Sequence, residues 1–91
     1  MTLGIYSIND RLVGFLQPVT DSNDAAAIRN FENVVLTPGT LYDHAPEDFS
    51  LFRVASFDSE TGLVTPLSQP DLLVTGQQVH LKSLKEDLTC V

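Results

Sequence analysis

The polar residues best suited to chemistry gather in one short stretch near the middle of the chain. Asp43, His44, Glu47 and Asp48 are all residue types that ligate metal ions. The stretch holds one histidine and no cysteine, and its spacing matches no metal-binding motif, so it does not predict a zinc site. We interpret it as a solvated turn in which Pro46 and the acids lead into the strand that follows. The sequence therefore predicts no metal ion here.

Two further carboxylates, Asp58 and Glu60, could act with Asp48 as paired groups for acid–base chemistry. All three lie in short turns that flank the stretch 50–57, where acids are common, and no feature of the chain supplies an apolar pocket that would raise the pKa of one acid. The sequence also lacks a Gly-x-Ser-x-Gly elbow, a Gly-x-Gly-x-x-Gly fingerprint and a Gly-x-x-x-x-Gly-Lys loop. The single cysteine, Cys90, is poorly placed to act as a buried nucleophile beside a base. We expect a protein that is not an enzyme and uses no cofactor.

The charge balance constrains the choice of partner. Twelve acidic and five basic residues give a formal net charge of −7. The bases are scattered along the chain: Arg11, Arg29, Arg53, Lys82 and Lys85. Because sequence-independent affinity for nucleic acid comes mainly from cations that replace phosphate counterions, this balance opposes tight DNA binding. Such acidity is typical of a small protein kept in solution by its charge. The alternative interpretation is that the acids recognise a basic partner.

Aromatic rings offer another way to bind single-stranded nucleic acid, because bases stack on exposed rings with less help from charge. Most of the aromatic residues fall at expected core positions, whereas Tyr6 and Tyr42 are better surface candidates because a phenol tolerates water. Arg53 is a lone cation on an apolar strand. It reaches water, pairs with an acid across the sheet, or marks a contact surface. The residues predicted to contact nucleic acid or a protein partner are Arg53, Arg11, Arg29, Tyr6 and Tyr42.

The first half of the chain predicts two strands and a helix. Residues 2–8 alternate and are rich in strand-forming types, and residues 12–19 form a second strand whose Gly14 suggests a bulge. The few residues between them predict an antiparallel hairpin. The capping residues at 20–24 then precede a helix of about a dozen residues. Its apolar face carries Ile28, Phe31 and Val35, with Ala27 and Val34 beside them.

The second half predicts another hairpin. Residues 50–57 form a strand that is apolar on both faces, residues 58–62 form the turn, and residues 63–67 return as a fourth strand. Pro66 favours an edge position for that last strand, because it lacks a backbone N–H. The predicted fold class is α+β. Its small antiparallel four-stranded sheet follows the order strand, strand, helix, strand, strand, with one packed helix and a C-terminal tail.

We expect one domain, with residues 1–67 as its α+β core and residues 68–91 as a C-terminal tail. The tail would pack on the core or on a neighbouring subunit. Within it, residues 72–74 suit a short fifth strand, and residues 77–88 favour a short helix although part of that range also suits a strand.

The small size of the chain predicts self-association. A domain of 91 residues buries only about 60–65% of its unfolded surface, and one cysteine cannot form an internal disulfide. One helix covers one face of the sheet, yet the strand at 50–57 is apolar on both faces. We therefore expect a homo-oligomer.

No apolar run approaches the length of about 18 residues that a membrane-spanning helix needs. We therefore expect no membrane partner and a soluble protein of a reducing cytoplasm.

The order of several short motifs resembles a known family. The matching pieces are Ile5-Tyr6-Ser7-Ile8-Asn9-Asp10, then Phe15 to Pro18, then Asn23, Ala27, Arg29 and Phe31, and then Pro46-Glu47-Asp48-Phe49 with Leu51-Phe52, Phe57-Asp58 and Thr61-Gly62. Over about residues 3–67, this succession resembles the small nonstructural protein of gokushovirus-type microviruses, which are tailless phages with single-stranded DNA.

The resemblance implies a viral accessory protein of the host bacterial cytoplasm that acts in DNA replication or packaging, and some members are described as DNA-binding. It implies no catalytic residues. Two hypotheses follow. The protein binds single-stranded DNA by stacking and by a small surface of Arg11, Arg29 and Arg53, or it is an acidic module that binds a basic viral or host replication protein without touching DNA.

Overall fold

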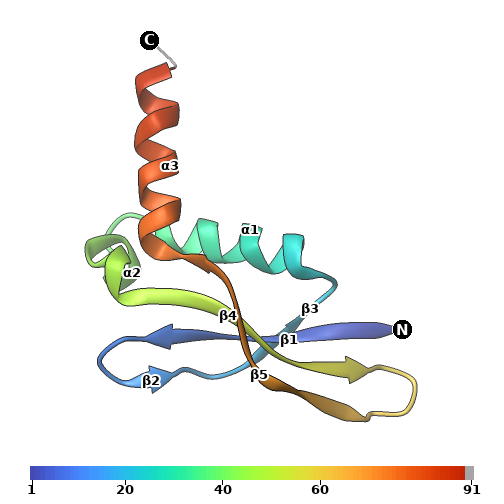
Figure 1. Cartoon of the computed structure of the whole chain (residues 1–91). Coiled ribbons are helices and arrows are strands. Elements are labelled where there is room, and N and C mark those ends of the chain that lie inside the picture. The colour runs from blue at the N-terminus through green and yellow to red at the C-terminus, as the bar shows by residue number, and fades with distance from the viewer. Residues whose placement is uncertain (90–91) are drawn as a thin grey trace.

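A computed structural model describes residues 1–89 of the chain, and the side chains of residues 1–85. Its elements, in chain order, are β1 (Thr2–Asp10), β2 (Gly14–Phe15), β3 (Val19–Asp21), α1 (Asp24–Val35), α2 (Leu41–His44), the 3-10 helix η1 (Pro46–Asp48), β4 (Phe49–Asp58), β5 (Val64–Thr75) and α3 (Gly76–Thr89). Figure 1 shows them as a strongly twisted sheet with α1 lying across it and α3 standing away from it. The predicted α+β class is confirmed.

The sheet is antiparallel and has the order β2-β1-β4-β5, with β3 paired to β1 as well. The second predicted strand, over 12–19, is wrong as a single element. Two short strands replace it, β2 opposite the end of β1 and β3 opposite its middle. Gly14 has a φ of 112°, which favours glycine, and Pro18 has no backbone N–H to donate. The Leu16 N–H still donates a hydrogen bond of 2.8 Å to the carbonyl of Ile8 in β1, so the pairing is interrupted at residues 17 and 18.

Helix α1 begins where the capping residues predicted. The Asn23 side chain accepts a hydrogen bond of 2.8 Å from the N–H of Ala26, and Asp24 occupies the first turn, where the helix dipole favours an acid. Its buried residues are Ala27, Phe31 and Val35, spaced four apart, so they form one stripe along the helix.

That stripe packs on one face of β1 and β4 and forms the core. Its buried members are Tyr6, Ala27, Phe31, Val35, Phe49, Leu51 and Val79. Val79 brings the start of α3 into this core, which confirms a helix in the tail. The strand alternative for the same residues is wrong.

The second hairpin is longer than expected. β5 runs from Val64 to Thr75 and includes residues 72–74, so these do not form a separate fifth strand. It also runs through residue 67, where the sequence placed the end of the core. Its pairing with β4 shifts register twice, between Leu51 and Phe52 and between Arg53 and Ala55. β5 lies at the edge of the sheet, as Pro66 predicted.

The segment between α1 and η1 contains the short helix α2, which includes Asp43 and His44 of the stretch interpreted as a solvated turn. The Thr40 hydroxyl caps it by accepting a hydrogen bond of 3.1 Å from the N–H of Asp43. The 3-10 helix η1 follows and leads directly into β4. No helix in the described range, residues 1–89, is long and apolar enough to cross a membrane.

Gly4 provides the first test of this packing. The Tyr6 side chain lies over the Gly4 backbone, and a Cβ at residue 4 would overlap the Tyr6 phenol. Because Tyr6 is fully buried and cannot swing into solvent, we expect Gly4→Ala to lower the free energy of unfolding by about 1–3 kcal/mol. Urea denaturation measures the loss. Gly4→Ala in a Tyr6→Leu background should cost clearly less, and an equal cost in both backgrounds would contradict the contact.

Candidate functional site

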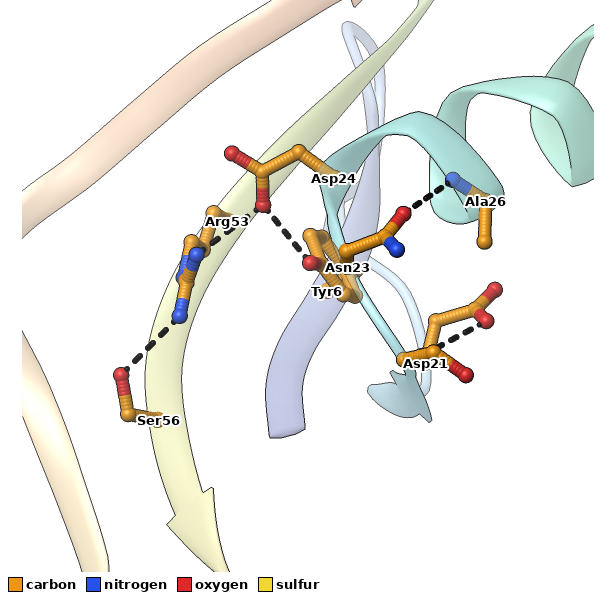
Figure 2. A network of polar contacts seen from close by, with 8 residues as sticks. Tyr6, Asp21, Asn23, Asp24, Ala26, Arg53 and Ser56 are labelled. Atoms are coloured by element: carbon orange, nitrogen blue, oxygen red, sulfur yellow. Dashed lines mark hydrogen bonds and ion pairs between the residues drawn. The ribbon is translucent and has the colours of Figure 1, made fainter. Parts of the chain in front are cut away.

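The most connected polar group of the described residues joins β1, α1 and β4. The Tyr6 hydroxyl donates a hydrogen bond of 2.7 Å to Oδ1 of Asp24, and Arg53 Nη1 donates one of 3.0 Å to the same oxygen. Arg53 Nη2 donates to the Ser56 hydroxyl at 3.2 Å. Figure 2 shows the phenol and the guanidinium converging on the Asp24 carboxylate.

Local structure places each member of this group. Tyr6 and Arg53 are directly opposite in the β1–β4 register, so their side chains lie on the same face of the sheet. The guanidinium carbon lies 6.0 Å from the centre of the Tyr6 ring. Asp24 follows the N-cap residue of α1, and that position directs its carboxylate down toward the sheet.

The environment suppresses ionisation of the phenol. Burial and the hydrogen bond to the Asp24 carboxylate raise the pKa of Tyr6 from 10.0 to about 12, although the nearby positive charge of Arg53 acts in the opposite direction. A tyrosine that serves as a base or nucleophile needs a lowered pKa. The group is therefore suited to holding α1 on the sheet and unsuited to acid–base chemistry.

The ion pair within the group is partly solvated. The Arg53 side chain is 26% exposed and that of Asp24 is 42% exposed, so solvent screens their attraction. Arg53 Nε is buried and has no hydrogen-bond partner among the described residues. Nη1 and Nη2 each make one hydrogen bond within the chain, and the charge of Arg53 is paired with that of Asp24.

The predicted contact residues are not brought together as one surface. Tyr6 is fully buried, so its predicted surface position is wrong. Tyr42 is only partly buried, and its ring centre lies 4.5 Å from that of Phe49. Arg11 Nε binds the Asp48 carboxylate at 2.9 Å, in the turn after β1, and Arg29 lies exposed on α1.

Of the three possibilities raised for Arg53, the structure shows pairing with an acid. The acid lies on α1 rather than on a neighbouring strand. Arg11, Arg29 and Arg53 thus belong to three different elements, and two of them are bound to carboxylates of the same chain. They do not form a joint basic patch.

The acids near the middle of the chain lie in two short helices. Asp43 lies in α2, and Glu47 and Asp48 lie in η1. Within the part of the chain that the structure describes, no three His, Cys, Asp or Glu residues gather closely enough to hold a metal ion. Cys90 lies outside the described residues.

Asp58 likewise organises its hairpin. Its Oδ1 accepts a hydrogen bond of 2.9 Å from the N–H of Glu60, and this bond is the main cause that lowers the pKa of Asp58 below its usual value. A general acid needs a raised pKa, so this carboxyl is not poised for that role.

A second surface was only half anticipated from the sequence. The sheet face turned away from α1 is here called the open face, and its apolar members are Leu3, Ile5, Phe15, Phe52, Phe57, Val64 and Leu72, as the strand registers place them. The Phe15 and Phe52 rings meet edge to face, with centres 5.3 Å apart. The strand at 50–57 showed that its second face is apolar, but only the register joins residues from four strands.

The fold defines a small α+β protein. The chain belongs to the Phage ORF5 protein family, whose model matches residues 3–79. That match extends beyond the resemblance over residues 3–67 and includes β5 and the start of α3. No curated protein and no solved structure matches the chain.

The raised pKa of Tyr6 predicts a loss of stability in alkali. The folded state binds the phenolic proton more tightly than the unfolded state, so the stability due to this proton is complete below pH 10 and is lost as the pH rises toward about 12. We expect a contribution of about 2–3 kcal/mol over this range.

Urea denaturation of wild type and Tyr6→Phe between pH 8 and about pH 11.5 measures this effect. The stability advantage of wild type should shrink as the pH rises. Tyr42→Phe is the matched control, because it leaves the Tyr6 phenol in place and should preserve the full alkaline loss. A constant difference between wild type and Tyr6→Phe would contradict the assignment.

Proposed function

We propose that this phage protein is a non-enzymatic accessory protein of a gokushovirus-type microvirus, and that it acts in viral DNA replication or packaging in the host cytoplasm. It does so by binding a basic viral or host replication protein. Family membership supports the phage origin. The arrangement of charges supports a protein partner in preference to DNA.

The observation that carries the proposal is the pairing of cations within the chain. Arg11 binds Asp48 and Arg53 binds Asp24, while Lys82 lies 3.9 Å from Glu32 and the N-terminal amine lies 3.7 Å from Glu60. Sequence-independent DNA binding needs several cations that meet successive phosphates. Here four positive groups face acids of the same chain, and the excess of acids gives the net charge of −7.

That excess can act over a distance. A strongly charged surface attracts an oppositely charged partner, raises the rate of association and disfavours partners of the same sign, DNA included. Exposed charges are screened within about 8 Å at physiological salt, so binding of this kind weakens steeply as salt is added.

Fluorescence anisotropy can separate a basic protein partner from DNA. The probes are a labelled peptide rich in lysine and arginine and a labelled single-stranded oligonucleotide of similar length, each at low and at physiological salt. We expect the peptide to bind at low salt and to lose about tenfold or more in affinity at physiological salt. We expect the oligonucleotide to bind more weakly than micromolar, and tighter binding of the oligonucleotide than of the peptide would overturn the proposal.

Single-stranded DNA binding is the second candidate function, and the aromatic pair on the open face favours it. The Phe15 side chain is 49% exposed and is held in place by Phe52, an arrangement on which a base could stack. The open face carries no cation, so the affinity would come from stacking and would change little with salt.

Phe15→Leu tests this candidate, because it keeps an apolar side chain and removes the ring. If DNA stacks there, the substitution should weaken oligonucleotide binding by about 1–3 kcal/mol. Leu12→Ala is the control, since Leu12 is also exposed and lies just before the same strand. Equal effects of the two substitutions, or binding unchanged by Phe15→Leu, would exclude the stacking mode.

A further inference from the structure

The open face is uncharged across four strands. Besides its apolar members, the register places Ser7, Asn9, Ser50, Ala55, Pro66 and Thr75 on that face. None of these residues is charged, although 19% of the chain is. Phe15, Val64 and Leu72 are each about half exposed, so the described chain leaves much of this apolar surface in contact with water.

The chain is extended for its size. Its accessible surface is 6050 Å². A folded monomer of this mass exposes about 5,200 Å², so the chain carries an excess of about 800 Å². Its radius of gyration is 14.3 Å, compared with about 12 Å for a compact domain of this length. The helix α3, which stands away from the sheet (Figure 1), and the half-exposed apolar residues of the open face both add to this excess.

The sheet edge at β5 is a poor alternative for self-association. β5 lies at the edge opposite β2 and β3, and Pro66 and Pro70 within it have no N–H to donate to an added strand. Its register shifts against β4 also interrupt a straight edge. A second sheet can therefore pack on the open face more readily than it can extend the sheet at β5.

We propose that the open face binds the open face of a second copy of this chain, which gives a two-fold symmetric dimer with two sheets packed face to face. In such a dimer each residue of the face meets the same surface on its partner. Two chains of net charge −7 can meet there because the face itself is uncharged, so the acids remain outside the contact. A basic protein would find no acid on the open face, so it would bind this chain elsewhere, on the surface that carries the acids. The dimer does not depend on the partner proposed above.

Sedimentation equilibrium or light scattering at about 10–100 μM protein tests the dimer. We expect wild type to have twice the chain mass of 10.0 kDa. Leu72→Glu and, separately, Phe15→Glu place like charges against each other across the two-fold axis and should weaken the dimer more than about 100-fold. Both residues are about half exposed in the single chain, so the substitutions should preserve the fold, which circular dichroism checks.

Leu41→Glu is the matched control. Leu41 is 61% exposed on α2, outside the open face, and the same added charge should leave the dimer unchanged. A wild-type mass of one chain overturns the proposal. A dimer that survives both open-face substitutions also overturns it, and loss of that dimer on Leu84→Glu would place the contact on α3, where Leu84 is 46% exposed.

Discussion

The arrangement of this protein depends on one buried phenol. Tyr6 has no exposed surface, so its hydroxyl needs a partner inside the protein, and the carboxylate at the start of α1 supplies it. Arg53, opposite Tyr6 on β4, balances that carboxylate, and Gly4 leaves room for the ring. Because these contacts join β1, β4 and the first turn of α1, they fix which face of the sheet the helix covers and where along the strands it begins.

This arrangement also shapes the charge that the protein presents to other molecules. The only cation of β4 is turned toward Asp24 and Ser56, so it adds little positive charge to the surface. Arg11 is engaged in the same way with Asp48. The acids in excess support the proposal that this member of the Phage ORF5 family binds a basic protein in preference to nucleic acid.

The sheet has one face covered by α1 and one open face. α1 is too narrow to cover more than one side, and α3 stands away from the sheet after Val79 enters the core (Figure 1). Among residues 1–89 no helix lies over Phe52 and its neighbours on the open face. The apolar open face therefore links the fold to the proposed dimer, because the same residues that extend the sheet would be covered by the second copy.

Local patterns in the sequence determined much of the fold. Asn23 and the alanines after it indicated the start of α1, and alternating apolar residues indicated β1 and β4. Pro66 indicated an edge strand because it lacks an N–H. Each of these signals acts within a few residues of the chain. Only the tertiary structure decided the position of Tyr6, whose phenol was expected to face water and is buried because Asp24, eighteen residues away, accepts its hydrogen bond. It likewise decided the partner of Arg53 and the joining of Phe15, Phe52 and Leu72 into one face. Those outcomes depend on strand register and on contacts between distant segments, which no local pattern contains.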